Sequence, residues 1–124
     1  MADRLLTDAE LELMHALWSG GPGTVRQVMA RMPDDRAYTT ISTILRILED
    51  KGFARSERVG RAFRYHPVLA REDYQARSLR HQVSAVFQGD AAGLLRHLVQ
   101  AEQLDDDALS ALRDLVAELP GEAP

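Results

Sequence analysis

Residues 37–52 have the sequence AYTTISTILRILEDKG, and this stretch decides the fold predicted for the chain. Its apolar residues recur every three or four positions, which is the spacing of one face of an α-helix: Ile41, Ile44, Leu45 and Leu48. Gly52 follows as a suitable C-terminal cap, since glycine tolerates the left-handed backbone found at helix ends. We therefore predict a helix over residues 38–51, with those four side chains in a core.

The other side of this predicted helix carries small hydroxyl groups and one arginine. Each residue advances about 100° around a helix, so Thr39, Thr43 and Arg46 lie opposite the apolar face. Thr40 and Ser42 flank them. Short side chains let a helix approach DNA bases closely, and arginine can bind guanine or a phosphate. A solvated face is the alternative, but such faces usually carry Glu, Lys and Gln. We predict that the recognition-helix residues that contact DNA are Tyr38, Thr39, Thr40, Ser42, Thr43 and Arg46.

Two shorter helices are predicted upstream of this one. Thr7 with Glu10, and Thr24 with Gln27, have the spacing of a capping box, in which each side chain caps the other residue's backbone N–H. The segment SGGPG at 19–23 ends the first of these helices, because glycine and proline break helical patterns. Three short helices joined by tight breaks resemble a helix-turn-helix core.

A basic β-hairpin is predicted directly after the third helix. Residues 53–58 and 62–66 flank Gly60, which supplies the turn, and Phe63 and Tyr65 share one side of the second strand. A hairpin in this place is the wing of a winged helix. Charges also protect an exposed strand edge, but the position after a hydroxyl-rich helix favours DNA contact. The residues predicted to contact DNA from the wing and along the backbone are Thr24, Arg26, Arg58, Arg61 and Arg64.

Residues 71–124 are predicted to form helices with apolar stripes that a single copy cannot cover. So short a segment buries too little surface for a firm core, and DNA-binding proteins of this size usually dimerise. Packing of these helices back onto the N-terminal core of a monomer is the alternative. The predicted dimerisation residues are Leu79, Val83, Val86, Phe87, Leu94, Leu95, Leu98, Leu109, Leu112, Leu115 and Val116.

The predicted fold class is mainly α with a small β-hairpin. We expect a winged helix-turn-helix DNA-binding domain at residues 1–70, followed by a helical dimerisation domain at residues 71–124. The net charge of the chain is −4, but residues 1–70 carry +1, residues 71–124 carry −5, and residues 36–66 carry +4. Screening makes the nearest charges dominate, so a local basic face can bind phosphates while the acidic half lies away from DNA.

Several other classes of protein do not fit the sequence. The chain has no cysteine, which excludes disulfides and thiolate metal sites, and no stretch approaches the roughly 20 apolar residues that cross a bilayer. The acidic run at 105–107 is explained by helix capping. The four histidines lack the spacing of a helical metal pair: His15, His66, His81 and His97. We expect a cytoplasmic protein that is not an enzyme and has no metal or cofactor.

The order of these segments resembles the penicillinase-repressor family, which includes the methicillin-resistance repressor and a copper-responsive branch. The resemblance covers residues 5–119 and depends most on AYTTISTIL at 37–45 together with GRAFRY at 60–65. The match of LTDAE at 6–10 is weaker. The resemblance implies a homodimer whose winged helix binds a palindromic double-stranded operator and represses genes of β-lactam resistance or a related stress. It assigns base contacts to Thr39, Thr40, Thr43 and Arg46, and backbone contacts to the wing.

Two departures from that family concern how repression is relieved. The β-lactam branch is cleaved at an Asn-Phe bond, where this chain aligns His97-Leu98. The copper branch releases DNA when metal binds cysteines, and this chain has none. Neither mechanism therefore transfers directly. Two other functions stay open at this point: a winged helix that contacts protein without a DNA target, and a regulator that senses a ligand between its C-terminal helices.

Overall fold

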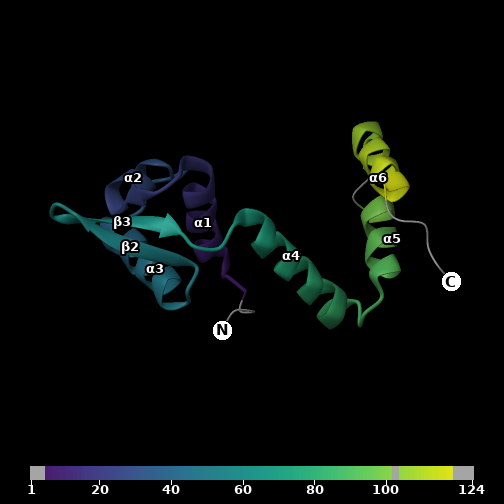
Figure 1. The fold of residues 1–124 in the computed structure, drawn as a ribbon, viewed down its shortest axis with the longest axis horizontal. Helices are drawn as coiled ribbons and strands as arrows, with labels where there is room; N and C mark the ends of the chain where they lie inside the picture. Colours follow the sequence, from purple (N-terminus) through teal and green to yellow (C-terminus); the bar gives the residue numbers. More distant parts are fainter. Residues whose placement is uncertain (1–4, 102–103, 119–124) are drawn as a thin grey trace. The chain divides into compact units, whose positions relative to one another are not determined.

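The structure, a computed structural model, describes residues 5–101 and 104–118 (Figure 1). The chain divides into two compact units, Met1–Leu79 and Arg80–Pro124. The elements of the first unit are α1 (Asp8–Gly20), β1 (Gly23–Thr24), α2 (Val25–Ala30), α3 (Tyr38–Asp50), β2 (Ala54–Val59), β3 (Ala62–Pro67) and most of α4 (Arg71–His81). Those of the second are the π-helix η1 (Gln82–Val86), α5 (Ala91–Ala101) and α6 (Asp106–Glu118). The predicted winged-helix class is confirmed.

Both predicted capping boxes are present. The Thr7 hydroxyl accepts the Glu10 N–H at 3.2 Å, and the Glu10 carboxylate accepts the Thr7 N–H at 2.9 Å. Thr24 and Gln27 make the same pair of bonds at the start of α2. Each box satisfies two N–H groups that have no partner within the helix, so the starts of α1 and α2 are set by local sequence.

The sheet has one strand more than the predicted hairpin. β2 and β3 pair antiparallel around a two-residue turn, in which Gly60 has a φ of 63°. This left-handed backbone suits glycine at the first turn position. The strand order is β1-β3-β2, with Gly23 opposite Tyr65. Two residues are too few for a period-two pattern, so β1 gave no strand signal in the sequence.

The core of the first unit is formed where α1, α2 and α3 meet the sheet. Its fully buried side chains are Leu13, Met14, Leu17, Val28, Ile41, Leu45 and Leu48. The prediction for α3 was wrong at Ile44, which is only half-buried. Leu11 and Trp18 on α1 are likewise half-buried, while Leu13 is fully buried. α1 is enclosed on more than one side, because it contacts α2, α3 and β3, so one stripe does not describe its buried face.

A buried ion pair joins the start of α1 to the end of α3. Lys51 Nζ donates to both carboxylate oxygens of Glu10, at 2.7 and 2.8 Å, and the Glu10 side chain is 8% exposed. Burial raises the pKa of Glu10, but the hydrogen bonds from Lys51 and Thr7 and the charge of Lys51 lower it more, so its pKa lies below the ordinary value.

A second group of bonds closes the far end of α1. Arg31 Nη1 donates to the carbonyls of Gly21 at 2.6 Å and Ala16 at 3.2 Å. These carbonyls lie at the C-terminal end of the helix, where a positive charge is stabilising. A Cβ added at Gly20 would come within 2.6 Å of the Arg31 guanidinium. Glycine at this position therefore makes room for the arginine that ties α2 to α1.

The second unit has well-capped helices but almost no interior. Asp90 accepts the Gly93 N–H at 2.9 Å at the start of α5, and Asp105 accepts the Ala108 N–H at 2.8 Å at the start of α6, as predicted for Asp105. Within residues 80–101 and 104–118, only Gly93 is buried. Among the helices that the structure describes, none combines the length and apolar character needed to cross a membrane.

The Glu10–Lys51 pair makes stability depend on pH. Because the folded-state pKa of Glu10 is lowered, its contribution is fully present above the unfolded-state pKa, about 4.3 for glutamate, and is lost as pH falls through the folded-state value. Glu10→Gln should lower the free energy of unfolding at pH 7 by about 1.5–3 kcal/mol, the range for hydrogen bonds to charged groups. It should also flatten the loss of stability below about pH 4.3. Urea unfolding from pH 7 to pH 3 measures both effects.

Glu12→Gln is the matched control, since Glu12 is two residues away and pairs with Arg36 at an exposed position. It should change stability at pH 7 much less than Glu10→Gln. A Glu10→Gln protein with the wild-type pH profile would contradict the assignment.

Candidate nucleic-acid interface

The outward side of α3 is open to solvent. Thr39, Thr40, Thr43 and Arg46 are exposed, and Tyr38 is 45% exposed. Ser42 is half-buried at the edge of this face. Ile41, Leu45 and Leu48 on the opposite side are fully buried, so packing has oriented the helix as its pattern indicated. The predicted recognition-helix residues thus lie on one accessible surface.

In the described part of the chain, the arginines predicted to contact DNA have no carboxylate partner. Among the described residues, no carboxylate pairs with Arg26, Arg46, Arg61 or Arg64, and Arg58 contacts the Gly60 carbonyl and the Phe63 ring. Unpaired guanidinium groups keep all their donors available for phosphates or base edges. The positive charge of these arginines can therefore attract an anion such as a DNA phosphate.

Three other cations of the first unit, Arg31, Arg36 and Lys51, are engaged by the protein itself. Arg36 binds Glu12 at 2.9 Å and Asp34 at 2.8 Å, and these hydrogen bonds raise the pKa of Arg36. Lys51 binds Glu10, and Arg31 donates to backbone carbonyls. Glu10, Glu12 and Asp34 thus pair with Lys51 and Arg36, whereas no described carboxylate pairs with Arg46 on the outer side of α3.

The start of α2 meets the start of α3 at this surface. The Arg26 guanidinium lies 5.2 Å from the centre of the Tyr38 ring, a cation–π contact. Arg26 is thereby held beside the recognition helix. Thr24 is placed differently, because its hydroxyl caps α2 and it is half-buried in β1. The hydroxyl oxygen of Thr24 already accepts the Gln27 N–H, so only its proton is left to donate to DNA.

The wing distributes its arginines over two faces and a tip. Residues directly opposite each other on paired strands share a face, and Arg58 lies opposite Phe63 while Glu57 lies opposite Arg64. Successive side chains alternate, so Arg58 shares the face of Phe63 and Tyr65, whereas Arg64 lies on the other face. Arg61 lies in the turn. The structure therefore brings Arg58, but not Arg64, to the side that packs against the helices.

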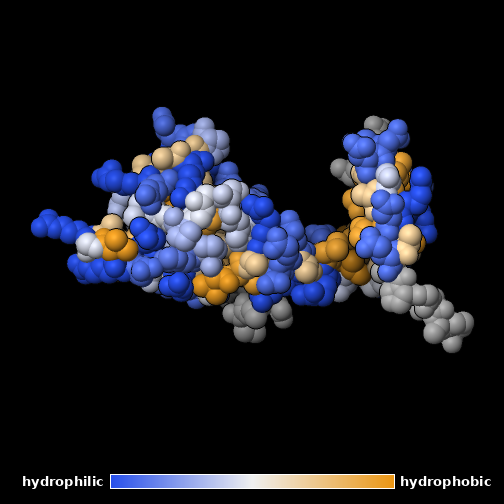
Figure 2. Space-filling model, turned by 45° about the horizontal axis from the view of Figure 1, so that its top comes forward, coloured by the Kyte–Doolittle hydropathy of each residue, from blue (hydrophilic) through white to orange (hydrophobic). Residues whose placement is uncertain are grey.

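Phe63 is a candidate that the sequence analysis missed as a functional residue. It shares a face with Tyr65, which is 5% exposed, yet Phe63 itself is 49% exposed because the hairpin extends beyond the helices. The Arg58 guanidinium lies 5.9 Å from its ring centre. Figure 2 shows an apolar patch among the hydrophilic side chains at this end of the molecule, where Val59 is also 40% exposed. The alternation of aromatic and basic side chains over Phe63, Arg64 and Tyr65 is the sequence signal that could have indicated this residue.

One carboxylate fixes the wing to the recognition helix. Glu49 on α3 accepts hydrogen bonds from the Ser56 N–H at 3.0 Å and the Ser56 hydroxyl at 2.7 Å. Burial raises the pKa of the neighbouring Tyr65 hydroxyl; the charge of Glu49 adds to the rise, and Arg46 opposes it. Tyr65 therefore stays neutral at physiological pH, and the angle between α3 and β2 is set by short polar contacts.

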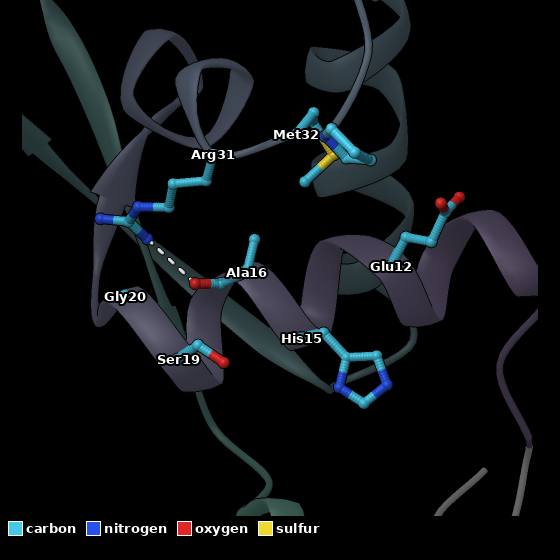
Figure 3. Close-up of a pocket in the computed structure, with 8 residues that line it drawn as sticks. Glu12, His15, Ala16, Ser19, Gly20, Arg31 and Met32 are labelled. Atoms are coloured by element: carbon cyan, nitrogen blue, oxygen red, sulfur yellow. Dashed lines mark hydrogen bonds between the residues drawn. The ribbon is translucent and has the colours of Figure 1, made fainter.

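A cavity of about 500 Å³ lies on another part of this unit, between α1 and the segment that follows α2 (Figure 3). Its polar groups are largely engaged, since Glu12 binds Arg36 and Arg31 donates to Ala16 and Gly21. Within the part of the chain that the structure describes, no three His, Cys, Asp or Glu side chains gather in a way that could hold a metal. The α3 surface and wing are therefore the stronger candidate site.

Comparisons with known proteins find related transcription regulators. The transcriptional regulator BlaI of Mycobacterium tuberculosis is 38% identical over 121 residues, which cover 92% of this chain and 84% of the relative. The methicillin resistance regulatory protein MecI of Staphylococcus aureus is 23% identical over 113 residues, covering 90% and 92%. A solved chain titled "CopR Repressor Structure" is 31% identical, with a TM-score of 0.46, and covers 53% of this chain and 99% of that one.

A sequence model of the family described as penicillinase repressor matches residues 6–118, nearly the whole described chain. The family predicted from the helix and wing motifs is thereby confirmed, and it is a family of transcription regulators rather than enzymes. The chain belongs to the penicillinase repressor family.

Proposed function

We propose that this protein is a sequence-specific transcriptional repressor that binds a palindromic operator as a homodimer. The observation that carries the proposal is the exposed outer side of α3, with its hydroxyl groups and an arginine that no described carboxylate neutralises. The family supports a role in regulating transcription. Related proteins named for methicillin resistance support target genes of β-lactam resistance or a related stress. Such a protein acts in the cytoplasm, where its operator is.

The contacts proposed at each half-site follow from this surface. α3 enters the major groove, where Thr39, Thr40 and Thr43 come close to base edges because their side chains are short. Arg46 binds a guanine or a phosphate. The wing and Arg26 contact the DNA backbone, which positions the helix without selecting a sequence. Repression follows because the bound protein excludes the transcription machinery from the promoter.

The homodimer is supported by the apolar side chains that the second unit leaves exposed. Leu95, Leu98 and Val99 on α5 are 40–41% exposed, and Leu115 and Val116 on α6 are 61% and 59% exposed. Apolar surface gathered on amphipathic helices marks an interface, and Figure 2 shows apolar side chains concentrated on these helices. A second copy of the same helices covers that surface and places two recognition helices on two half-sites.

Arg46→Ala should weaken binding to the preferred duplex by about 1–3 kcal/mol, because a bidentate arginine–guanine pair contributes that much discrimination. Fluorescence anisotropy with the duplex that the wild-type protein selects from a randomised pool measures the change. Arg96→Ala removes the same charge from α5 and should bind like wild type. Equal affinities for Arg46→Ala and wild type would exclude Arg46 from the interface.

Arg61→Ala should weaken binding to every duplex alike, since a turn arginine contacts phosphate. The slope of log affinity against log salt should become shallower by about 0.9, the value for one neutralised phosphate on duplex DNA. Titrations at several salt concentrations, on the selected duplex and on a random one, give both numbers. If Arg61→Ala altered base preference and kept the slope, the wing would be assigned the wrong role.

Leu98→Glu together with Leu115→Glu should convert the protein to a monomer, because the dimer would bury two new charges on each side. In one chain both side chains are exposed, so the helices should keep their circular dichroism. Light scattering at micromolar concentration should give twice the 13.8 kDa chain mass for wild type and for Arg96→Ala, and the single mass for the double variant. A wild-type mass of 13.8 kDa would refute the homodimer.

A further inference from the structure

A group of polar and aromatic contacts attaches the beginning of α4 to α1. We name it the α4 clasp and define it by Trp18, Arg71 and Tyr74. The Trp18 indole N–H donates to the Leu69 carbonyl at 2.8 Å, just before α4 begins. The ring of Trp18 lies 6.0 Å from that of Tyr74. The proposed function uses none of these residues.

Tyr74 is the centre of the clasp. It is 6% exposed, its hydroxyl accepts the backbone N–H of Leu6 at 3.0 Å, and its ring meets the edge of Phe53 at 6.2 Å. A buried tyrosine hydroxyl with a backbone partner fixes both the position and the rotation of its helix. α4 is thus held by the segment before α1 and by the residue before β2.

Arg71 adds a third attachment at the first turn of α4. Its guanidinium donates to the Ser19 hydroxyl at 2.9 Å and lies 6.0 Å from the centre of the Trp18 ring. Trp18, Arg71 and Tyr74 therefore attach the first turns of α4 to the rest of the first unit. Contacts of this number and direction determine where the helix points.

The same helix carries, near its end, the first of the apolar side chains proposed to form the dimer. Leu79 in the last turns of α4 is 53% exposed, and Val86 at the end of η1, which follows α4 directly, is 62% exposed. α4 therefore connects two tasks in one continuous segment. Its first turns are attached to the DNA-binding unit, and its last turn starts the surface that meets a second copy.

We propose that the α4 clasp is the device that sets the half-site spacing of the operator, with Trp18 and Tyr74 as its positioning residues; this rests on the proposed homodimer. One base pair moves a half-site by about 3.4 Å and rotates it by about 34° around the DNA axis. A dimer in which α4 is held firmly on each DNA-binding unit cannot follow such a change in spacing. A dimer in which α4 is attached loosely can adjust to it. The clasp thereby acts on specificity without touching DNA.

A series of duplexes tests the proposal. The palindromic duplex selected by wild-type protein is compared with versions whose half-sites are one base pair closer or farther apart, and with a single half-site. Wild type should lose at least about 10-fold in affinity for each altered spacing. The variant Trp18→Phe/Tyr74→Phe removes both hydrogen bonds but keeps aromatic rings, and its loss should shrink below about 3-fold. Gln75→Ala, on an exposed position of α4, should behave like wild type.

Binding to the single half-site distinguishes a loss of positioning from a loss of folding. The double variant should bind the single half-site within about 2-fold of wild type, because the α3 surface is unchanged. An unaltered spacing profile in the double variant would overturn the proposal, as would a parallel loss on every duplex. Wild-type protein that selects a single half-site with no two-fold repeat would overturn the homodimer on which the proposal rests, and with it the proposal.

A measurement without an operator gives a second test. The chain has no cysteine, so Asp35→Cys in the exposed loop before α3 accepts one spin label per copy. The label-to-label distance in the free dimer should be narrowly distributed in this background and clearly broader when Trp18→Phe/Tyr74→Phe is added. Ser19→Ala, which removes only the acceptor of Arg71, should broaden it less. Equal distributions in the labelled proteins with and without the clasp substitutions would contradict a positioning role, even where both fold normally.

Discussion

The structure depends on the burial of one side of α3. Ile41, Leu45 and Leu48 are fully buried, and α3 packs against α1, α2 and the sheet. Burial of apolar side chains is the largest stabilising effect available to a small domain. A helix rotated by half a turn would expose these side chains and bury Thr39 and Thr43 without partners. The apolar side therefore determines which residues face solvent, and the surface proposed to contact DNA is a consequence of the packing of the core.

Charge pairing supports the same surface from the surrounding structure. Glu10 is bound to Lys51 and Glu12 to Arg36, so these carboxylates stabilise the unit away from the outer side of α3. Arg46 and Arg61 are left without acidic partners among the described residues. A net charge of −4 is thus compatible with DNA binding, because the field at a groove-sized surface is set by the nearest charges.

The two units differ in how far they bury their apolar side chains. The first encloses its apolar side chains within one chain, while the second leaves Leu115 and Val116 more than half exposed. The helices α5 and α6 of this second unit are capped by Asp90 and Asp105, which satisfy N–H groups at the helix starts. In the proposed homodimer this division would separate the part that contacts DNA from the part that joins two copies, with α4 between them in the chain.

Local patterns in the sequence were enough to predict the helices, the capping boxes and the exposed side of α3, because each depends on residues within one or two turns. Contacts between distant segments were decided only in the tertiary structure. The pairing of Glu10 with Lys51, the short strand β1 against Tyr65, and the bonds of Trp18 and Tyr74 to Leu69 and Leu6 join residues that no periodicity connects. Phe63 is exposed and Ile44 only half-buried for the same reason. The spacing of residues along the chain indicates which face of a helix or strand a side chain occupies. Whether that face is buried depends on the neighbours that the fold places against it.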